Sequence, residues 1–125
     1  MRIMRAVVGL VFVVVAVPAV GAQPVSPDFV ARGKLDTAQK LAQQRRVADA
    51  RREVVEVIRM PGVSGPLRVQ SYLMAGNLSF RERDYATARR AFKRLLDLPE
   101  ATEEDRRAAR LGLQMVDTFE GTRAP

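Results

Sequence analysis

The segment that decides the fold is Arg45 to Pro61, RRVADARREVVEVIRMP, together with a second copy 38 residues later, Arg83 to Pro99, RDYATARRAFKRLLDLP. The two segments align without a gap; six of the 17 pairs are identical and five more exchange one apolar residue for another. In both copies apolar residues recur every three or four positions and a proline closes the segment, which is typical of an amphipathic helix that ends before proline. An internal period of this length predicts a helical repeat array.

The sequence on either side of the two copies completes a pattern of five helices. Ser26 followed by Pro27 is a helix start, with serine as N-cap and proline at the first helical position. Thr102 followed by three acidic residues is a second start, of the capping-box type. Because no segment alternates as a strand does, the predicted class is all-α. The expected helices span residues 27–44, 47–60, 66–83, 85–98 and 102–119.

The apolar positions predict which face of each helix is buried. The helix at 66–83 carries two apolar stripes, so we expect neighbours to cover it on two sides. Expected core positions of the helix at 27–44 are Val30, the Lys34 stem, Ala38, Leu41 and Ala42. We expect the helix at 102–119 to cover the open end of the array through Ala108, Leu111, Gly112, Met115 and Phe119.

Residues 68–100 carry a fixed order of aromatic, small and turn residues. They are Tyr72, Ala75-Gly76, Asp84-Tyr85, Ala88, Phe92 and Pro99, and residues 34–61 follow the same order with Lys34, Thr37-Ala38, Val47, Ala50, Val54 and Pro61. In this order the chain resembles the tetratricopeptide repeat, a stacking helix-turn-helix unit. The resemblance implies a short right-handed solenoid of two hairpins, about 27–61 and 66–99, with a capping helix at 102–119. Gly76 and Ala88 would then let paired helices approach closely, while Tyr72 and Phe92 fill the space between repeats. A generic bundle of four or five helices is the alternative.

The first 22 residues have the organisation of a secretory signal peptide. Arg2 and Arg5 precede an unbroken apolar run at 6–17, and Val20-Gly21-Ala22 is the small-residue pattern that signal peptidase recognises. We predict cleavage after Ala22 and export, most simply to a bacterial periplasm, leaving a short lead at 23–26, a helical domain at 27–120 and a tail at 121–125. An uncleaved membrane anchor is the alternative, although an apolar stretch of this length is near the minimum that spans about 30 Å of hydrocarbon.

The composition removes most enzyme chemistry. The chain has no Cys and no His, which excludes thiol nucleophiles, disulfides, Ser-His pairs and ordinary zinc sites. The acidic pairs Glu53/Glu56 and Glu103/Glu104 are explained as an exposed helix face and as helix-start charge. We therefore predict a protein that is not an enzyme and needs no cofactor or metal.

One stripe of side chains repeats at the 38-residue shift, on the first helix of each expected hairpin. It consists of Leu35, Gln39 and Gln43 in the first unit and of Leu73, Asn77 and Arg81 in the second. A spacing of four places each trio along one helix face. The resemblance implies that this face is concave and binds a peptide or partner protein, and amide and guanidinium groups suit a peptide backbone or a carboxylate. The predicted function is a protein–protein interaction module, an adaptor in a cell-envelope assembly; the alternative for the stripe is solvated surface with its leucines in the core.

The helix at 85–98 carries the most basic surface, formed by Arg89, Arg90, Lys93 and Arg94, in a chain of net charge +7. Most such runs are solvated helix faces. The alternative function is a small structural envelope protein that attaches electrostatically to an anionic membrane or polymer through this basic face. Nucleic acid is not an expected partner, because export removes the chain from it.

Overall fold

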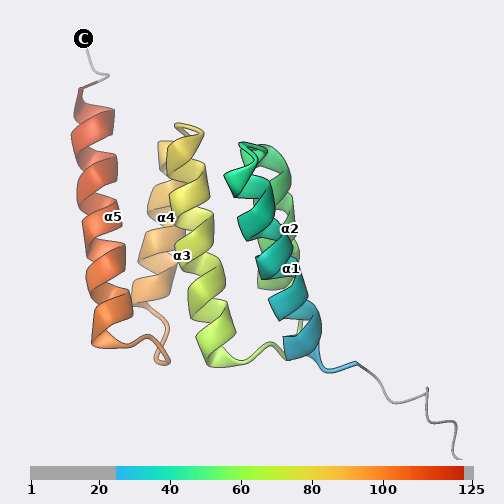
Figure 1. The fold of residues 1–125 in the computed structure, drawn as a ribbon. Helices are drawn as coiled ribbons and strands as arrows, with labels where there is room; N and C mark the ends of the chain where they lie inside the picture. Colours follow the sequence, from blue (N-terminus) through green and yellow to red (C-terminus); the bar gives the residue numbers. More distant parts are fainter. Residues whose placement is uncertain (1–24, 123–125) are drawn as a thin grey trace, which may run out of the picture.

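The structure, a computed structural model, describes residues 25–122 of the chain. The described part contains five helices and no strand, so the all-α prediction is confirmed (Figure 1). The predicted signal peptide and the last three residues of the predicted tail lie outside the described residues. The helices are α1 (Pro27–Gln43), α2 (Val47–Arg59), α3 (Gly65–Arg81), α4 (Tyr85–Leu96) and α5 (Glu103–Gly121), and each begins and ends within two residues of its predicted position.

The helices form two successive hairpins followed by a single helix. In the view of Figure 1, α1, α3 and α5 lie nearer the viewer and α2 and α4 lie behind them. Each helix packs against the next in the chain, and α3 also packs against α1 and α5. Thus α3 contacts all four other helices, which is why its sequence is apolar on two sides.

Both hairpins turn in the same way. Arg45 and Arg83 have φ angles of 63° and 60°, the left-handed conformation that usually belongs to glycine at a helix C-terminus. Around Arg83, the amide of Asp84 donates to the Ser79 carbonyl and that of Arg83 to the Phe80 carbonyl, and the same two bonds form around Arg45. The 38-residue period of the sequence therefore corresponds to a repeated turn geometry.

The buried apolar residues fall into two clusters on either side of α3. The first lies among α1, α2 and α3 and is centred on Val54 and Val57; the second lies among α3, α4 and α5 and is centred on Phe92 and Leu95. Helix α3 supplies buried residues to both clusters. Val54 and Val57 of α2 and Phe92 and Leu95 of α4, which match at the 38-residue shift, thus all lie in the core.

Phe92 is held between two glycines. A Cβ built on Gly76 of α3 or on Gly112 of α5 would lie 2.5 Å from a ring atom of Phe92. The predicted role of Gly76 in close helix approach is confirmed, and Gly112 of α5 approaches the same ring equally closely. In the first hairpin, Ala38 takes the place of Gly76 and Val54 takes the place of Phe92, 38 residues earlier. Alanine is larger than glycine and valine is smaller than phenylalanine, and both Ala38 and Val54 are fully buried.

The predicted covering face of α5 is only partly right: Gly112 is buried as predicted, but the larger apolar residues are not. The buried residues of α5 are Ala109, Gly112 and Val116, whereas Leu111, Met115 and Phe119 are 57%, 41% and 48% exposed. The physical reason is that the Phe92 ring occupies the contact between α4 and α5, so only small side chains fit opposite it. The larger apolar residues of α5 are turned away from this contact.

The core face of α1 is partly as predicted: Ala38 is buried and Leu41 and Ala42 pack against the first cluster, but the face also includes two residues that were not expected there. Its buried residues are Ala31, Leu35 and Ala38, while Val30 and Leu41 are only half-buried. The Lys34 ammonium forms ion pairs with Glu53 and Glu56 of α2, and the hydrogen bond with Glu56 raises its pKa. Helix α1 is covered by both α2 and α3, which widens the face that must be apolar.

The two predicted helix starts differ in how they are capped. Thr102 forms the capping box, because its hydroxyl accepts from the Asp105 amide and the Asp105 carboxylate accepts from the Thr102 amide. Ser26 occupies the N-cap of α1, but its side chain makes no capping hydrogen bond. Asp28 in the same turn instead accepts from the Ser64 amide at 2.8 Å, which lowers its pKa and ties α1 to the loop before α3.

Candidate binding surfaces

The stripe predicted on the first helix of each hairpin is only partly available to a partner. Leu35 is 2% exposed and belongs to the first core cluster, and Leu73 is half-buried against the second. These leucines therefore contribute mainly to packing. The polar members of the stripe are all exposed: Gln39, Gln43, Asn77 and Arg81.

Arg81 lies at the end of α3, where three elements meet. Its Nη2 donates to the Ala42 carbonyl at 3.3 Å, across to the last turn of α1. It also lines a recess of about 370 Å³ together with Phe80, Arg83, Tyr85, Phe119 and Thr122. One wall of this recess is aromatic: the Phe80 ring centroid lies 5.7 Å from that of Tyr85 and 5.2 Å from that of Phe119, the latter edge-on. A guanidinium beside aromatic rings can bind a group that is partly apolar and partly anionic.

Leu111, Met115 and Phe119 form an apolar stripe on α5, called the α5 stripe below. Their spacing of four places them on one helix face. Phe119 contacts Phe80 of α3, whereas Asp117 and Glu120 reach Arg89 of α4. The α5 stripe therefore runs along the side of α5 that adjoins α3. The sequence predicts these residues in a covering face; the small residues Ala109 and Gly112 beside them are the signal that separates the two faces.

The predicted basic face does not act as one set of free charges. Arg89 is ion-paired to both Asp117 and Glu120 of α5 at 2.6 Å, and these hydrogen bonds, led by Asp117, raise its pKa. Arg89 thus links α4 to α5. Arg90 donates to the Thr87 hydroxyl at 3.0 Å, and Lys93 and Arg94 are exposed, with no carboxylate paired to any of the three within residues 25–122.

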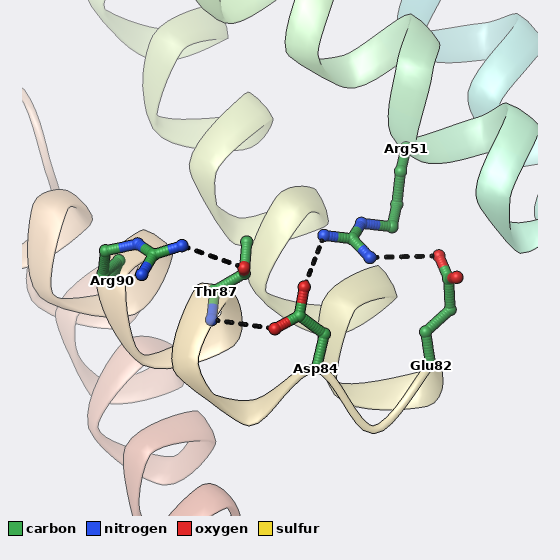
Figure 2. Close-up of polar contacts among 5 residues, drawn as sticks. All are labelled: Arg51, Glu82, Asp84, Thr87 and Arg90. Atoms are coloured by element: carbon green, nitrogen blue, oxygen red, sulfur yellow. Dashed lines mark hydrogen bonds and ion pairs between the residues drawn. The ribbon is translucent and has the colours of Figure 1, made fainter.

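A corresponding arginine of α2 links the two hairpins. Arg51 bonds Glu82 at 3.3 Å and Asp84 at 3.0 Å, in the turn between α3 and α4 (Figure 2). The Asp84 carboxylate also accepts from the Thr87 amide as the N-cap of α4, and the hydrogen bonds with Thr87 and then Arg51 lower its pKa. Arg51 and Arg89 are 38 residues apart, so each hairpin reaches the next unit through the same position of its second helix.

The described residues contain no group of Asp and Glu side chains arranged to hold a metal ion. Nor do they include a buried polar side-chain atom left without a hydrogen-bond partner. Within the same residues, every helix is too short or too polar to cross a bilayer.

Comparison of the chain with protein-family models, curated proteins and solved structures finds no significant match. The function must therefore be argued from the surfaces themselves.

Proposed function

We propose that the chain is a non-enzymatic interaction module with a tetratricopeptide-like architecture, in which two hairpins and the capping helix α5 form a short right-handed solenoid. Two kinds of contact support this architecture. The first helix of each unit packs against the first helix of the next, as α1 does with α3 and α3 with α5. Arg51 and Arg89 also make equivalent links to the following unit.

The binding surface in this proposal is the side shared by α1, α3 and α5. The main support for this surface is the recess at its edge, which is lined by both Arg81 of α3 and Phe119 of the α5 stripe. A partner segment along this side would find the exposed amides of Gln39, Gln43 and Asn77 for its backbone and the α5 stripe for its apolar side chains. An exposed apolar stripe next to polar side chains marks interaction surfaces on small proteins.

The compartment in this proposal is the bacterial cell envelope, and the partner is a protein or peptide of an envelope assembly. Support comes from residues 1–22, which have a basic start, an apolar run and a small-residue cleavage pattern. No cofactor or metal enters the proposed activity.

The test is a photo-crosslink from position 77 in cells that export the protein through its own signal, with mass spectrometry of the adduct. We expect one dominant protein adduct from position 77 and none from position 86, an exposed alanine on α4 that serves as the control. Combining Met115→Gln with Arg81→Ala should reduce the adduct at least tenfold while circular dichroism remains unchanged. Equal labelling from both positions, or an adduct that survives the double substitution, would contradict the proposal.

A second candidate function rests on the three unpaired cations of the basic face, Arg90, Lys93 and Arg94. Here the chain is a small structural envelope protein that attaches electrostatically to an anionic membrane. The measurement is co-sedimentation with vesicles containing phosphatidylglycerol at low and high salt. Attachment that weakens with salt and is lost when these three residues become alanine supports this function, whereas salt-independent attachment excludes it.

A further inference from the structure

A second recess separates α2 from α4. The backbones of these two helices do not approach each other closely; both pack on α3, which forms the floor between them. The opening, called the α2/α4 groove below, has a volume of about 280 Å³. It is lined by Val55 and Ile58 of α2, Tyr72 and Ala75 of α3, and Thr87, Arg90, Ala91 and Arg94 of α4.

The floor and walls of the α2/α4 groove are apolar. Val55, Ile58 and Tyr72 are half-buried, so part of each side chain faces the opening. Ala75 and Ala91 leave room where larger side chains would close it. Apolar surface in a recess is reached by a protruding side chain and not by a flat layer of lipid head groups, so the shape favours a protein segment over a membrane.

The rim of the groove is cationic and uncompensated. Arg90 and Arg94 are one helical turn apart on α4, and both are exposed. The nearby carboxylates of Glu82 and Asp84 are already bound by Arg51, and Figure 2 shows the Arg51 guanidinium between them while Arg90 extends to the Thr87 hydroxyl. Glu56 on α2 is bound by Lys34. These three carboxylates thus have other partners.

We propose that the α2/α4 groove binds a short acidic segment of a partner protein. A bulky apolar side chain of the segment enters the groove between Ile58 and Tyr72, and carboxylates on either side of it bond to Arg90 and Arg94. Guanidinium groups match carboxylates in shape and charge, which supplies the complementarity that the rim lacks within the chain. Because α2 and α4 lie behind α1, α3 and α5, this site is separate from the surface of the proposed function (Figure 1).

The test is selection of nine-residue peptides from a random phage-displayed library on the purified exported protein, followed by fluorescence anisotropy with the synthetic winners. We expect enrichment of peptides that carry Asp or Glu on both sides of a Leu, Phe or Trp. Substitution of Arg90→Ala with Arg94→Ala should weaken their binding about tenfold or more and reduce its salt dependence. Val55→Glu, which places a negative charge in the groove, should weaken it similarly.

The matched control is Arg107→Ala with Arg110→Ala, which removes two exposed arginines of α5 and should leave the affinity unchanged. Asn77→Ala with Arg81→Ala should also leave it unchanged, so failure of the groove site can be told apart from failure of the proposed function. Enriched peptides without acidic residues, or binding that is insensitive to the groove substitutions, would overturn the proposal. If phosphatidylglycerol vesicles do not displace the selected peptides, the groove proposal is supported. If vesicles bind through Arg90 and Arg94 while no acidic peptide is enriched, the proposal is overturned in favour of a membrane.

Discussion

At the scale of single residues, the packing of Phe92 depends on Gly76 and Gly112. Gly76→Ala would add a methyl group 2.5 Å from the buried ring, and the ring has little room to move because Gly112 lies equally close to it. We expect Gly76→Ala to lower the free energy of unfolding by about 1–3 kcal/mol, despite the better helix propensity of alanine. Urea denaturation followed by circular dichroism measures the change.

Gly33 provides the control for this substitution. It also lies inside a helix, α1, but a Cβ there would meet nothing within 4 Å. Gly33→Ala should therefore raise the stability by about 0.5–1 kcal/mol. If Gly76→Ala behaved like Gly33→Ala, the close approach of α3 to Phe92 would be wrong.

Arg45 is a second residue whose backbone decides the effect of a substitution. Its φ of 63° costs an L-residue about 1–2 kcal/mol that glycine avoids, partly offset by the greater freedom of glycine in the unfolded chain. We expect Arg45→Gly to raise the free energy of unfolding by roughly 0.5 kcal/mol, and with it the melting temperature. Arg52→Gly, inside α2, should lower the free energy of unfolding by about 1 kcal/mol. A lower melting temperature for Arg45→Gly would contradict the left-handed turn.

At the scale of helices, the start of α4 depends on a titratable group. Asp84 is its N-cap and bonds Arg51, and both interactions hold the Asp84 pKa below its ordinary value of 3.8. The resulting stabilisation is fully present above the unfolded pKa and is lost as the pH falls through the folded pKa. Asparagine can still cap the helix. Asp84→Asn should therefore cost roughly 0.5 kcal/mol at pH 7, because it removes the charge that strengthens the Thr87 cap and the partly exposed Arg51 pair.

The measurement is the difference in melting temperature between wild type and Asp84→Asn at pH 7 and at pH 2.5. We expect the difference to be smaller at the lower pH, because protonation of Asp84 removes its charge. Asp36→Asn, at an exposed position of α1, should show no difference at either pH. A difference as large at pH 2.5 as at pH 7 would mean that the carboxylate charge is not what Asp84 contributes.

The helices themselves were predictable because their signals are local. Prolines, the Thr102 capping box and the three- to four-residue apolar period each act within a few residues, so the boundaries of all five helices came within two residues. The inward face of α5 was not predictable in this way. Its choice between Leu111 and Ala109 depends on where Phe92 of another helix lies, and the small residues Ala109 and Gly112 are the mark that this contact leaves in α5.

The candidate surfaces show the same limit. Gln39, Gln43, Asn77 and Arg81 are exposed, but Leu35 and Leu73, which follow the same spacing of four, pack in the core, so the spacing alone does not separate surface from core. The sequence could not indicate that Arg89 is neutralised, because its partners Asp117 and Glu120 are some 30 residues away on α5. The α2/α4 groove likewise exists only because two helices that are distant in sequence are held apart on α3.

At the scale of the whole molecule, the question is whether the two hairpins unfold separately or together. Longer repeat arrays can unfold unit by unit, because each unit contacts only its neighbours. Here α3 contributes buried residues to both core clusters and contacts every other helix. Loss of α3 would remove one wall from both clusters at once, so we expect a single cooperative transition.

The substitution that tests this is Leu95→Ala, a fully buried change in the second cluster, compared with Arg107→Ala on the surface. We expect Leu95→Ala to destabilise the protein by about 2–4 kcal/mol. Amide hydrogen exchange should then accelerate by the same factor in α2, which belongs to the first cluster, as in α4, because both helices exchange through the same global opening. If α2 kept its protection while α4 lost it, the hairpins would be separate folding units and the coupling through α3 would be refuted.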